Sequence, residues 1–133
     1  MERMTERLET ARRALVSFEE VLDEPKTKIV RDASIQRFEY TFEACWKAAK
    51  LFHKHHEGTD INSPKAAVRA SFQIGILDEA EARLGIAMVD DRNLTVHTYN
   101  EDLAEEIYGR LASYSGLMNS WLEAMRCQLQ KVD

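Results

Sequence analysis

The sequence predicts an all-α protein, and three observations support this prediction. Ala, Leu, Glu, Lys and Arg dominate the 133 residues, whereas only two prolines and five glycines are present to interrupt helices. Apolar residues recur at gaps of three and four along most of the chain, which is the spacing of one face of an α-helix. Helix-capping residues, glycines and prolines lie between the apolar stripes and mark where one helix ends and the next begins. We therefore expect one domain, residues 1–133, in which about five helices form an up-and-down bundle like a four-helix bundle.

The first two expected helices are separated at Pro25. Residues 4–22 carry one apolar stripe, consisting of Met4, Leu8, Ala11, Leu15, Phe18 and Leu22. Pro25 ends this helix because proline has no N–H for the preceding turn. The second helix is expected over residues 27–57 and ends at Gly58, which suits a left-handed cap. Its length and wide apolar face predict a central element of the bundle.

Capping signals divide the remainder into three more helices. Ser63 and Pro64 predict a short apolar helix, with serine as the cap and proline at the first helical position. Asp78 caps a fourth helix that begins at about Glu79, and Asn100 caps a last helix that runs to about residue 129. The apolar residues of the fourth helix fall on more than one side. Such a helix lies centrally in the bundle or is shared with another subunit.

Composition excludes several classes of protein. A net charge of −5 argues against a general nucleic-acid binder, which needs a broad cationic surface, but leaves room for a small, locally basic site. Cys45 and Cys127 match neither a metal nor a redox spacing, so we expect two buried thiols in a reducing cytosol. The N-terminal segment lacks the apolar core of a signal peptide. No apolar run approaches the roughly 20 residues needed to cross a bilayer. We therefore expect a cytoplasmic protein without a membrane partner.

The segment from Asp90 to Asn100 concentrates groups able to bind a phosphate or move a proton. On one straight helix, Arg92 and His97 would point about 140° apart, whereas Asn93 and His97 form an i, i+4 pair. Two arrangements could unite them with Tyr99: the helix ends inside the segment, or two copies of the chain meet there. The structural alternative is a helix end with a capping asparagine, a surface arginine and a half-buried histidine.

These residue types suit metal-independent cleavage of RNA. Arginine binds a phosphodiester with two hydrogen bonds and stays charged throughout a reaction. Histidine can take a proton from a ribose 2′-hydroxyl near neutral pH and return one to the leaving group. Tyr99 could stack on a base, donate a hydrogen bond or act as a nucleophile toward a nucleotide.

Two other groups of polar residues have simpler interpretations. His53 and His56 could share a metal, but no carboxylate or cysteine pattern completes a site, so we expect none. Together with Lys50, Lys54 and His55, they complement the dipole at the end of the second helix. Four further charged residues interrupt the apolar face of that helix and either flank it in solvent or project into a cleft: Asp32, Arg37, Glu39 and Glu43.

Three segments together resemble a known family. They are residues 31–43 with Trp46 and Lys47, residues 63–72, and the Arg92-x4-His97-x-Tyr99 segment. In order and spacing they resemble the nucleotidyltransferase substrate-binding proteins, which belong to the HEPN superfamily and include the HepT toxins. The resemblance covers nearly the whole chain.

The resemblance implies a helical bundle that forms a homodimer and a partner that is a minimal nucleotidyltransferase. The partner would use ATP and magnesium, whereas this chain would need no cofactor. Such pairs are toxin–antitoxin modules in which the HEPN member is an endoribonuclease. By residue match, Arg92 and His97 would be catalytic, Asn93 would support them, and Tyr99 would receive AMP from the partner. The alternative is a non-catalytic subunit that presents a substrate to the nucleotidyltransferase.

Overall fold

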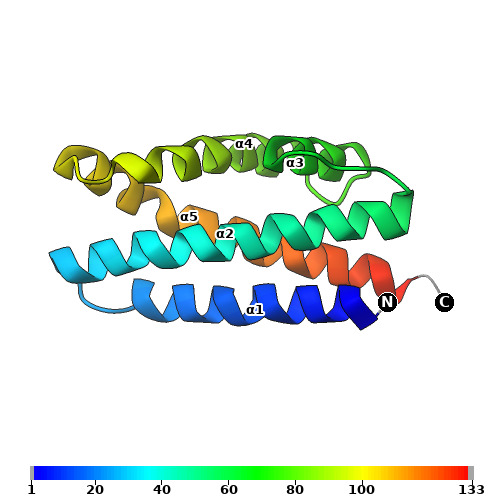
Figure 1. The fold of residues 1–133 in the computed structure, drawn as a ribbon, viewed down its shortest axis with the longest axis horizontal. Helices are drawn as coiled ribbons and strands as arrows, with labels where there is room; N and C mark the ends of the chain where they lie inside the picture. The colour runs from blue at the N-terminus through cyan, green and yellow to red at the C-terminus, as the bar shows by residue number, and fades with distance from the viewer. Residues whose placement is uncertain (1, 132–133) are drawn as a thin grey trace.

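The computed structural model describes residues 2–131, which form five α-helices and one short 3-10 turn (Figure 1). The helices are α1 (Glu2–Leu22), α2 (Lys28–Glu57), α3 (Pro64–Gln73), α4 (Glu79–Leu94) and α5 (Glu101–Gln130). The 3-10 turn η1 (Thr95–His97) lies between α4 and α5. The expected all-α bundle of five helices is confirmed.

The three longest helices lie side by side, and α3 and α4 pack over α2 and α5 on the side away from α1 (Figure 1). In this view α2 and α5 run from left to right, whereas α1 and α4 run the other way, which is the expected up-and-down order. Consequently α2 and α5 begin at the same end of the bundle, and α4 ends there. The Asp90–Asn100 segment is therefore placed beside the N-terminal turns of α2 and α5.

Local side-chain hydrogen bonds set the helix boundaries where the sequence predicts them. Four polar side chains accept a hydrogen bond from the first-turn backbone of the helix that follows: Thr27, Ser63, Asp78 and Asn100. Asp78 also forms a reciprocal capping box with Glu81. Gly58 ends α2 with φ of 68°, a left-handed conformation that glycine adopts without a Cβ penalty.

The predicted apolar stripes form the core. The largest side chains buried in it are Trp121, Tyr114, Phe18, Phe38, Phe42 and Phe52. Trp46 is only partly buried at its edge, and Phe72 of the apolar helix α3 is 47% exposed. The apolar side chains of α4 pack against α3 and α5 within one chain. The predicted dimer stays a prediction.

The expectation of two buried thiols is half right. Cys45 is fully buried, and burial raises its pKa to about 12, so it stays a thiol. Cys127 lies near the end of α5 and is only partly buried. Within residues 2–131, no helix is both long and apolar enough to cross a membrane.

Candidate functional site

The Asp90–Asn100 segment folds as a helix end followed by a tight reversal. Helix α4 stops at Leu94, and η1 turns the chain before Asn100 caps α5. Threonine hydroxyls support this change of direction. Thr95 Oγ1 lies 2.7 Å from the Arg92 carbonyl oxygen, and Thr98 Oγ1 donates to the Thr95 carbonyl at 2.9 Å. Such bonds compete with helix continuation, so the helix ends inside the motif, as the first of our two arrangements requires.

Arg92 is held against α2. Its guanidinium lies 3.7 Å from Glu39 and 3.9 Å from Glu43, and it donates to Thr95 Oγ1 at 3.2 Å. The side chain is 24% exposed, and its Nε is buried without a hydrogen-bond partner among the described residues. The interleaved carboxylates of α2 therefore project toward the candidate arginine. Two acids therefore partly neutralise the charge of the guanidinium.

His97 and Tyr99 project from the turn into solvent. Tyr99 is 82% exposed, His97 is also exposed, and their ring centroids lie 6.0 Å apart in an edge-to-face arrangement. Asn93 is exposed on the last turn of α4. Among residues 2–131, no hydrogen bond or ion pair joins Arg92 to His97. One chain thus brings His97 and Tyr99 together, whereas Arg92 has separate neighbours on α2.

A shallow groove of about 240 Å³ lies beside the Tyr99 ring. Its walls come from α2, the turn and the start of α5: Arg31, Asp32, Ile35, Gln36, Glu39, Thr98, Tyr99 and Glu101. Glu39 lines this groove and also pairs with Arg92. The groove therefore connects the exposed phenol to the arginine through one carboxylate.

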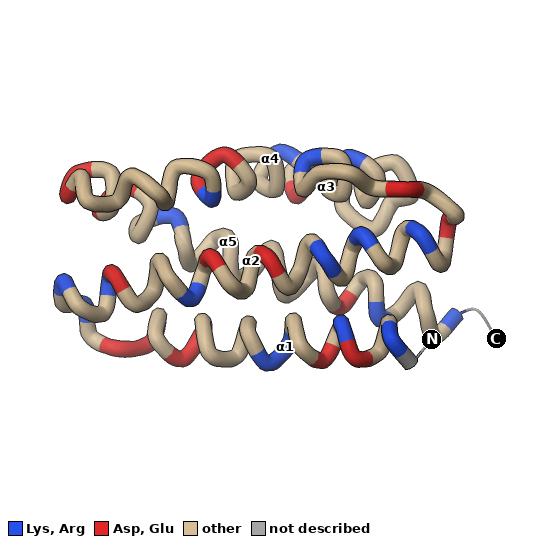
Figure 2. Tube along the Cα trace, in the orientation of Figure 1, with Lys and Arg blue, Asp and Glu red and all other residues tan. Residues whose placement is uncertain are grey.

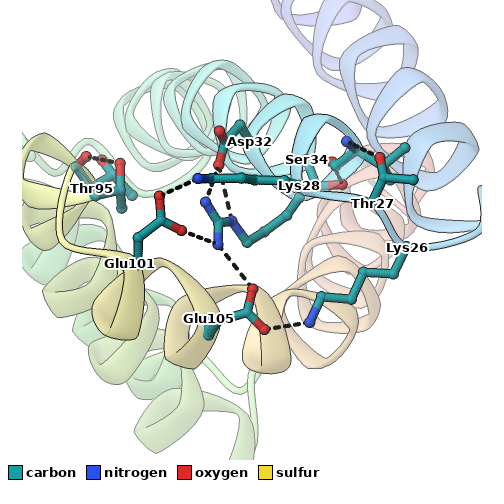
Figure 3. Close-up of polar contacts among 11 residues, drawn as sticks. Lys26, Thr27, Lys28, Asp32, Ser34, Thr95, Glu101 and Glu105 are labelled. Carbon is teal, nitrogen blue, oxygen red and sulfur yellow. Dashed lines mark hydrogen bonds and ion pairs between the residues drawn. The ribbon is translucent and has the colours of Figure 1, made fainter.

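An ionic network holds the floor of this groove. Arg31, whose side chain is 4% exposed, contacts Glu101 at 2.8 Å and Glu105 at 3.0 Å, and its third partner is Asp32 at 2.9 Å. Figure 3 shows these acids of α5, which Lys28 and Lys26 also contact. The Arg31 guanidinium donates to the Glu101 carboxylate, and this bond raises the pKa of Arg31 and lowers the pKa of Glu101. The network joins the first turns of α2 and α5.

A second anchor lies directly before Arg92. Asp91 is buried, accepts two hydrogen bonds from Arg110 at 2.7 and 2.9 Å, and accepts a third from the Tyr114 hydroxyl. Burial and the Asp91 carboxylate raise the pKa of Tyr114. Sequence reasoning missed this anchor. The available signal was the i, i+4 spacing of Arg110 and Tyr114, but nothing indicated which of two adjacent aspartates they would meet.

The histidines at the end of α2 face different neighbours. His53 is buried, and its Nε2 lies 3.0 Å from Ser71 Oγ. Ser71 donates to the Ala67 carbonyl and accepts from Trp121, so the neutral His53 ring carries its proton on Nε2. His56 stacks on Phe52 with ring centroids 4.9 Å apart. Within residues 2–131, no group of three histidine, cysteine or acidic residues has the geometry to hold a metal ion.

The Arg92-x4-His97-x-Tyr99 segment therefore lies between the last two helices of an all-α bundle. A model of the family described as nucleotidyltransferase substrate binding protein like matches residues 6–127. The chain therefore belongs to the nucleotidyltransferase substrate-binding protein family, as the resemblance predicted.

Three solved structures show how similar the chain is to known proteins. A protein from Thermus thermophilus is 48% identical, with a TM-score of 0.84 over 87% of this chain and 98% of that one. A Haemophilus influenzae protein, described as the substrate-binding domain of a nucleotidyltransferase, is 21% identical, with a TM-score of 0.74 over 90% and 98%. A mutant of the MntA–HepT toxin–antitoxin complex contains a chain that is 14% identical, with a TM-score of 0.77 over 96% and 99%. The last two show the fold alone. None of the curated proteins matches the chain.

Proposed function

We propose that this chain is the toxin of a toxin–antitoxin pair and acts as a metal-independent endoribonuclease. The observation that carries the proposal is the pair of exposed rings on the turn after α4, where His97 and Tyr99 lie 6.0 Å apart. An exposed imidazole can meet a large substrate such as RNA. An exposed phenol beside it is accessible to an enzyme that would block the same site.

The reaction uses the RNA chain's own nucleophile. His97 accepts the proton of a ribose 2′-hydroxyl, the 2′-oxygen attacks the adjacent phosphorus, and the bond from phosphorus to the 5′-oxygen breaks. The proton returns to the 5′-oxygen, so the products are a 2′,3′-cyclic phosphate and a 5′-hydroxyl. Arg92 binds the phosphate, where its fixed charge stabilises the additional negative charge of the transition state. Asn93 supports the substrate from the neighbouring turn of α4.

Completion of the site across a homodimer would reconcile this mechanism with the positions of Arg92 and His97 in one chain. Arg92 rests against Glu39 and Glu43, and His97 faces solvent. In the dimer that we propose, His97 of each copy would approach a phosphate held by an Arg92. The phosphate would then replace the carboxylates as the partner of the guanidinium.

Inhibition would come from a minimal nucleotidyltransferase. The partner would hold ATP and magnesium. The Tyr99 oxygen would bond to the α-phosphorus of ATP as the bond from that phosphorus to the β-phosphate oxygen breaks, so that pyrophosphate leaves and the phenol proton passes to solvent. The AMP group left on Tyr99 adds a negative charge and a bulky nucleoside within reach of His97. RNA would then be excluded by repulsion and by contact. The 82% exposure of Tyr99 supports this role, because the partner must reach the phenol.

The mechanism predicts that His97→Ala abolishes RNA cleavage while the fold is kept. His56→Ala is a matched control. It also removes an imidazole, but from the last turn of α2, whereas the proposed site lies beside the first turns of that helix. Cleavage of labelled RNA by the purified proteins, without divalent metal, measures the effect. Undiminished cleavage by His97→Ala would refute the assignment. Intact mass after incubation with the partner and ATP tests inhibition, since Tyr99→Phe should not gain the mass of AMP.

The position of Arg92 favours a second candidate function. An arginine already paired with two acids suits a non-catalytic subunit that presents a substrate to the nucleotidyltransferase. This alternative predicts a stable complex with the partner, no RNA cleavage by the chain alone, and full complex formation by His97→Ala. Cleavage by the purified chain excludes it.

A further inference from the structure

A basic groove lies between the start of α1 and the second half of α2. It has a volume of about 460 Å³, and its lining consists of Arg3, Arg7, Lys47, Lys50, Leu51, Lys54 and His55. None of these lining residues is acidic, although the chain as a whole has a net charge of −5. Figure 2 shows lysine and arginine positions spaced along the second half of α2 and at the start of α1. The groove is a local concentration of positive charge in an acidic protein.

Three lysines form a row along one face of α2. At 100° per residue, Lys47, Lys50 and Lys54 fall within an arc of about 60°, with steps of roughly 4.5 and 6 Å along the axis. These steps are comparable to the spacing of phosphates along a single strand. The present partners of the row are exposed acids, since Lys47 lies 4.0 Å from Glu43 and Lys54 lies 3.8 Å from Asp60. Exposed ion pairs of this kind contribute at most about 1 kcal/mol, so a phosphate can replace them.

An aromatic ring lies beside the row. Lys50 Nζ is 5.9 Å from the centroid of the Trp46 ring, and this ring is only partly buried. Cations that follow a backbone, together with an aromatic face on which a base can stack, are the combination found in single-strand-binding proteins. An acidic protein partner could pair with the lysines, but it has no base to stack on the Trp46 ring.

The row continues to the candidate catalytic arginine. Glu43 lies 4.0 Å from Lys47 on one side and 3.9 Å from Arg92 on the other. The same carboxylate also accepts from Trp46 Nε1 at 3.3 Å. One side chain therefore joins the last cation of the groove to the proposed site of cleavage.

We propose that this groove binds the phosphate backbone of single-stranded RNA and leads the strand past Glu43 to Arg92. The choice of RNA rests on the proposed ribonuclease function; the choice of a single strand rests on the lysine row and Trp46. Sequence is not read in the groove, because phosphate contacts carry no base information.

Binding is tested in a His97→Ala background, which separates it from cleavage. Fluorescence anisotropy of a labelled single-stranded RNA gives the affinity of Lys50→Gln/Lys54→Gln over a range of salt. Each lost phosphate contact reduces the slope of log K against log salt by about 0.7, which at about 0.1 M salt is roughly fivefold in affinity. The double variant should therefore bind roughly 25-fold more weakly, with a slope shallower by about 1.4. Arg13→Gln/Arg83→Gln is the matched control: it makes the same charge change at exposed positions on α1 and α4 and should bind within about twofold of the parent.

If the lysine variant and the control lost the same RNA affinity, net charge alone would explain the effect, and the inference would be overturned. RNA binding unchanged by the lysine substitutions, with loss of binding to the nucleotidyltransferase, would also overturn it and assign the groove to a protein. Wild-type protein that binds RNA through the lysines but does not cut it supports the groove and refutes only the nuclease assignment. The two proposals can therefore fail separately.

Discussion

Replacing Asp91 by asparagine tests whether a buried carboxylate holds the end of α4, and with it Arg92, against α5. The substitution keeps the side-chain shape and removes the charge. Asp91 is 8% exposed and accepts hydrogen bonds from both nitrogens of the Arg110 fork and from Tyr114. An asparagine amide can accept fewer of these bonds, and its NH₂ group would face a donor.

The expected cost follows from which partners are buried. A hydrogen bond to a charged group contributes about 1.5–3 kcal/mol, but Arg110 is 45% exposed and regains water when released. We therefore count the buried Tyr114 bond and a reduced share of the Arg110 pair, together about 2–3 kcal/mol. With an unfolding entropy of about 2.1 cal/mol/K per residue, or roughly 0.28 kcal/mol/K for 133 residues, Tm falls by about 7–11 °C.

Asp90→Asn is the matched control, because it makes the same chemical change one residue earlier. Asp90 is exposed and pairs with Lys65 at 2.7 Å on the surface, so its loss costs at most about 1 kcal/mol, or under about 4 °C. Thermal unfolding followed by circular dichroism at pH 7 gives both values. If the two variants melted at the same temperature, or if Asp91→Asn lowered Tm by less than about 3 °C, the buried anchor would be refuted.

Two further predictions concern the region where α2, α3 and α4 meet. Burial lowers the pKa of His53 below its usual 6.5. Below pH 6.5 the unfolded chain therefore binds more protons than the folded chain. The free energy of unfolding decreases as the pH falls through this range, by up to about 1.4 kcal/mol per pH unit. Urea unfolding between pH 7.5 and 5 should show this slope in the wild type and in His55→Gln, but not in His53→Gln. A Cβ on Gly85 would lie 2.9 Å from Val68 Cγ1, so Gly85→Ala should lower the free energy of unfolding by about 1–2 kcal/mol despite its better helix propensity. Gly109→Ala, with open space around the Cβ on α5, should be neutral or stabilising, and equal behaviour of the two variants would contradict the close contact of α3 and α4.

The helices were predictable because their signals are local. Ser63, Asp78 and Asn100 bond to backbone only three residues away, so their chemistry is visible in the sequence. Gly58 marks the end of α2 for the same reason. Apolar spacing likewise identified the buried faces, since a helix that packs must repeat its apolar residues every three or four positions.

The neighbours of Arg92 were not predictable in the same way. Glu39 and Glu43 were recognised as charges on an apolar face, but their direction depends on how α2 crosses α4. Asp90 and Asp91 are adjacent and chemically identical, yet one is exposed and the other is buried against α5. Only helix rotation in the bundle distinguishes them. The roles of the site residues therefore stay proposals. The structure adds that, within one chain, Arg92 lies against α2 and apart from His97 and Tyr99.

The carboxylate of Glu43 offers the sharpest test of how Arg92 is used. If Arg92 binds phosphate, Glu43 competes with RNA for both Arg92 and Lys47, so Glu43→Gln should tighten RNA binding. The Lys47–Glu43 pair is largely exposed and the Arg92–Glu43 contact is long at 3.9 Å, so their loss is counted as about 1 kcal/mol and the gain is up to roughly fivefold. Glu106→Gln, at an exposed position of α5, makes the same change of net charge as a control and should gain less. Anisotropy in the His97→Ala background measures both variants. In a non-catalytic subunit the arginine is structural, and Glu43→Gln would lower stability without tightening RNA binding. Affinity that is equal in the two variants would therefore mean that Glu43 keeps Arg92 in place rather than away from a substrate.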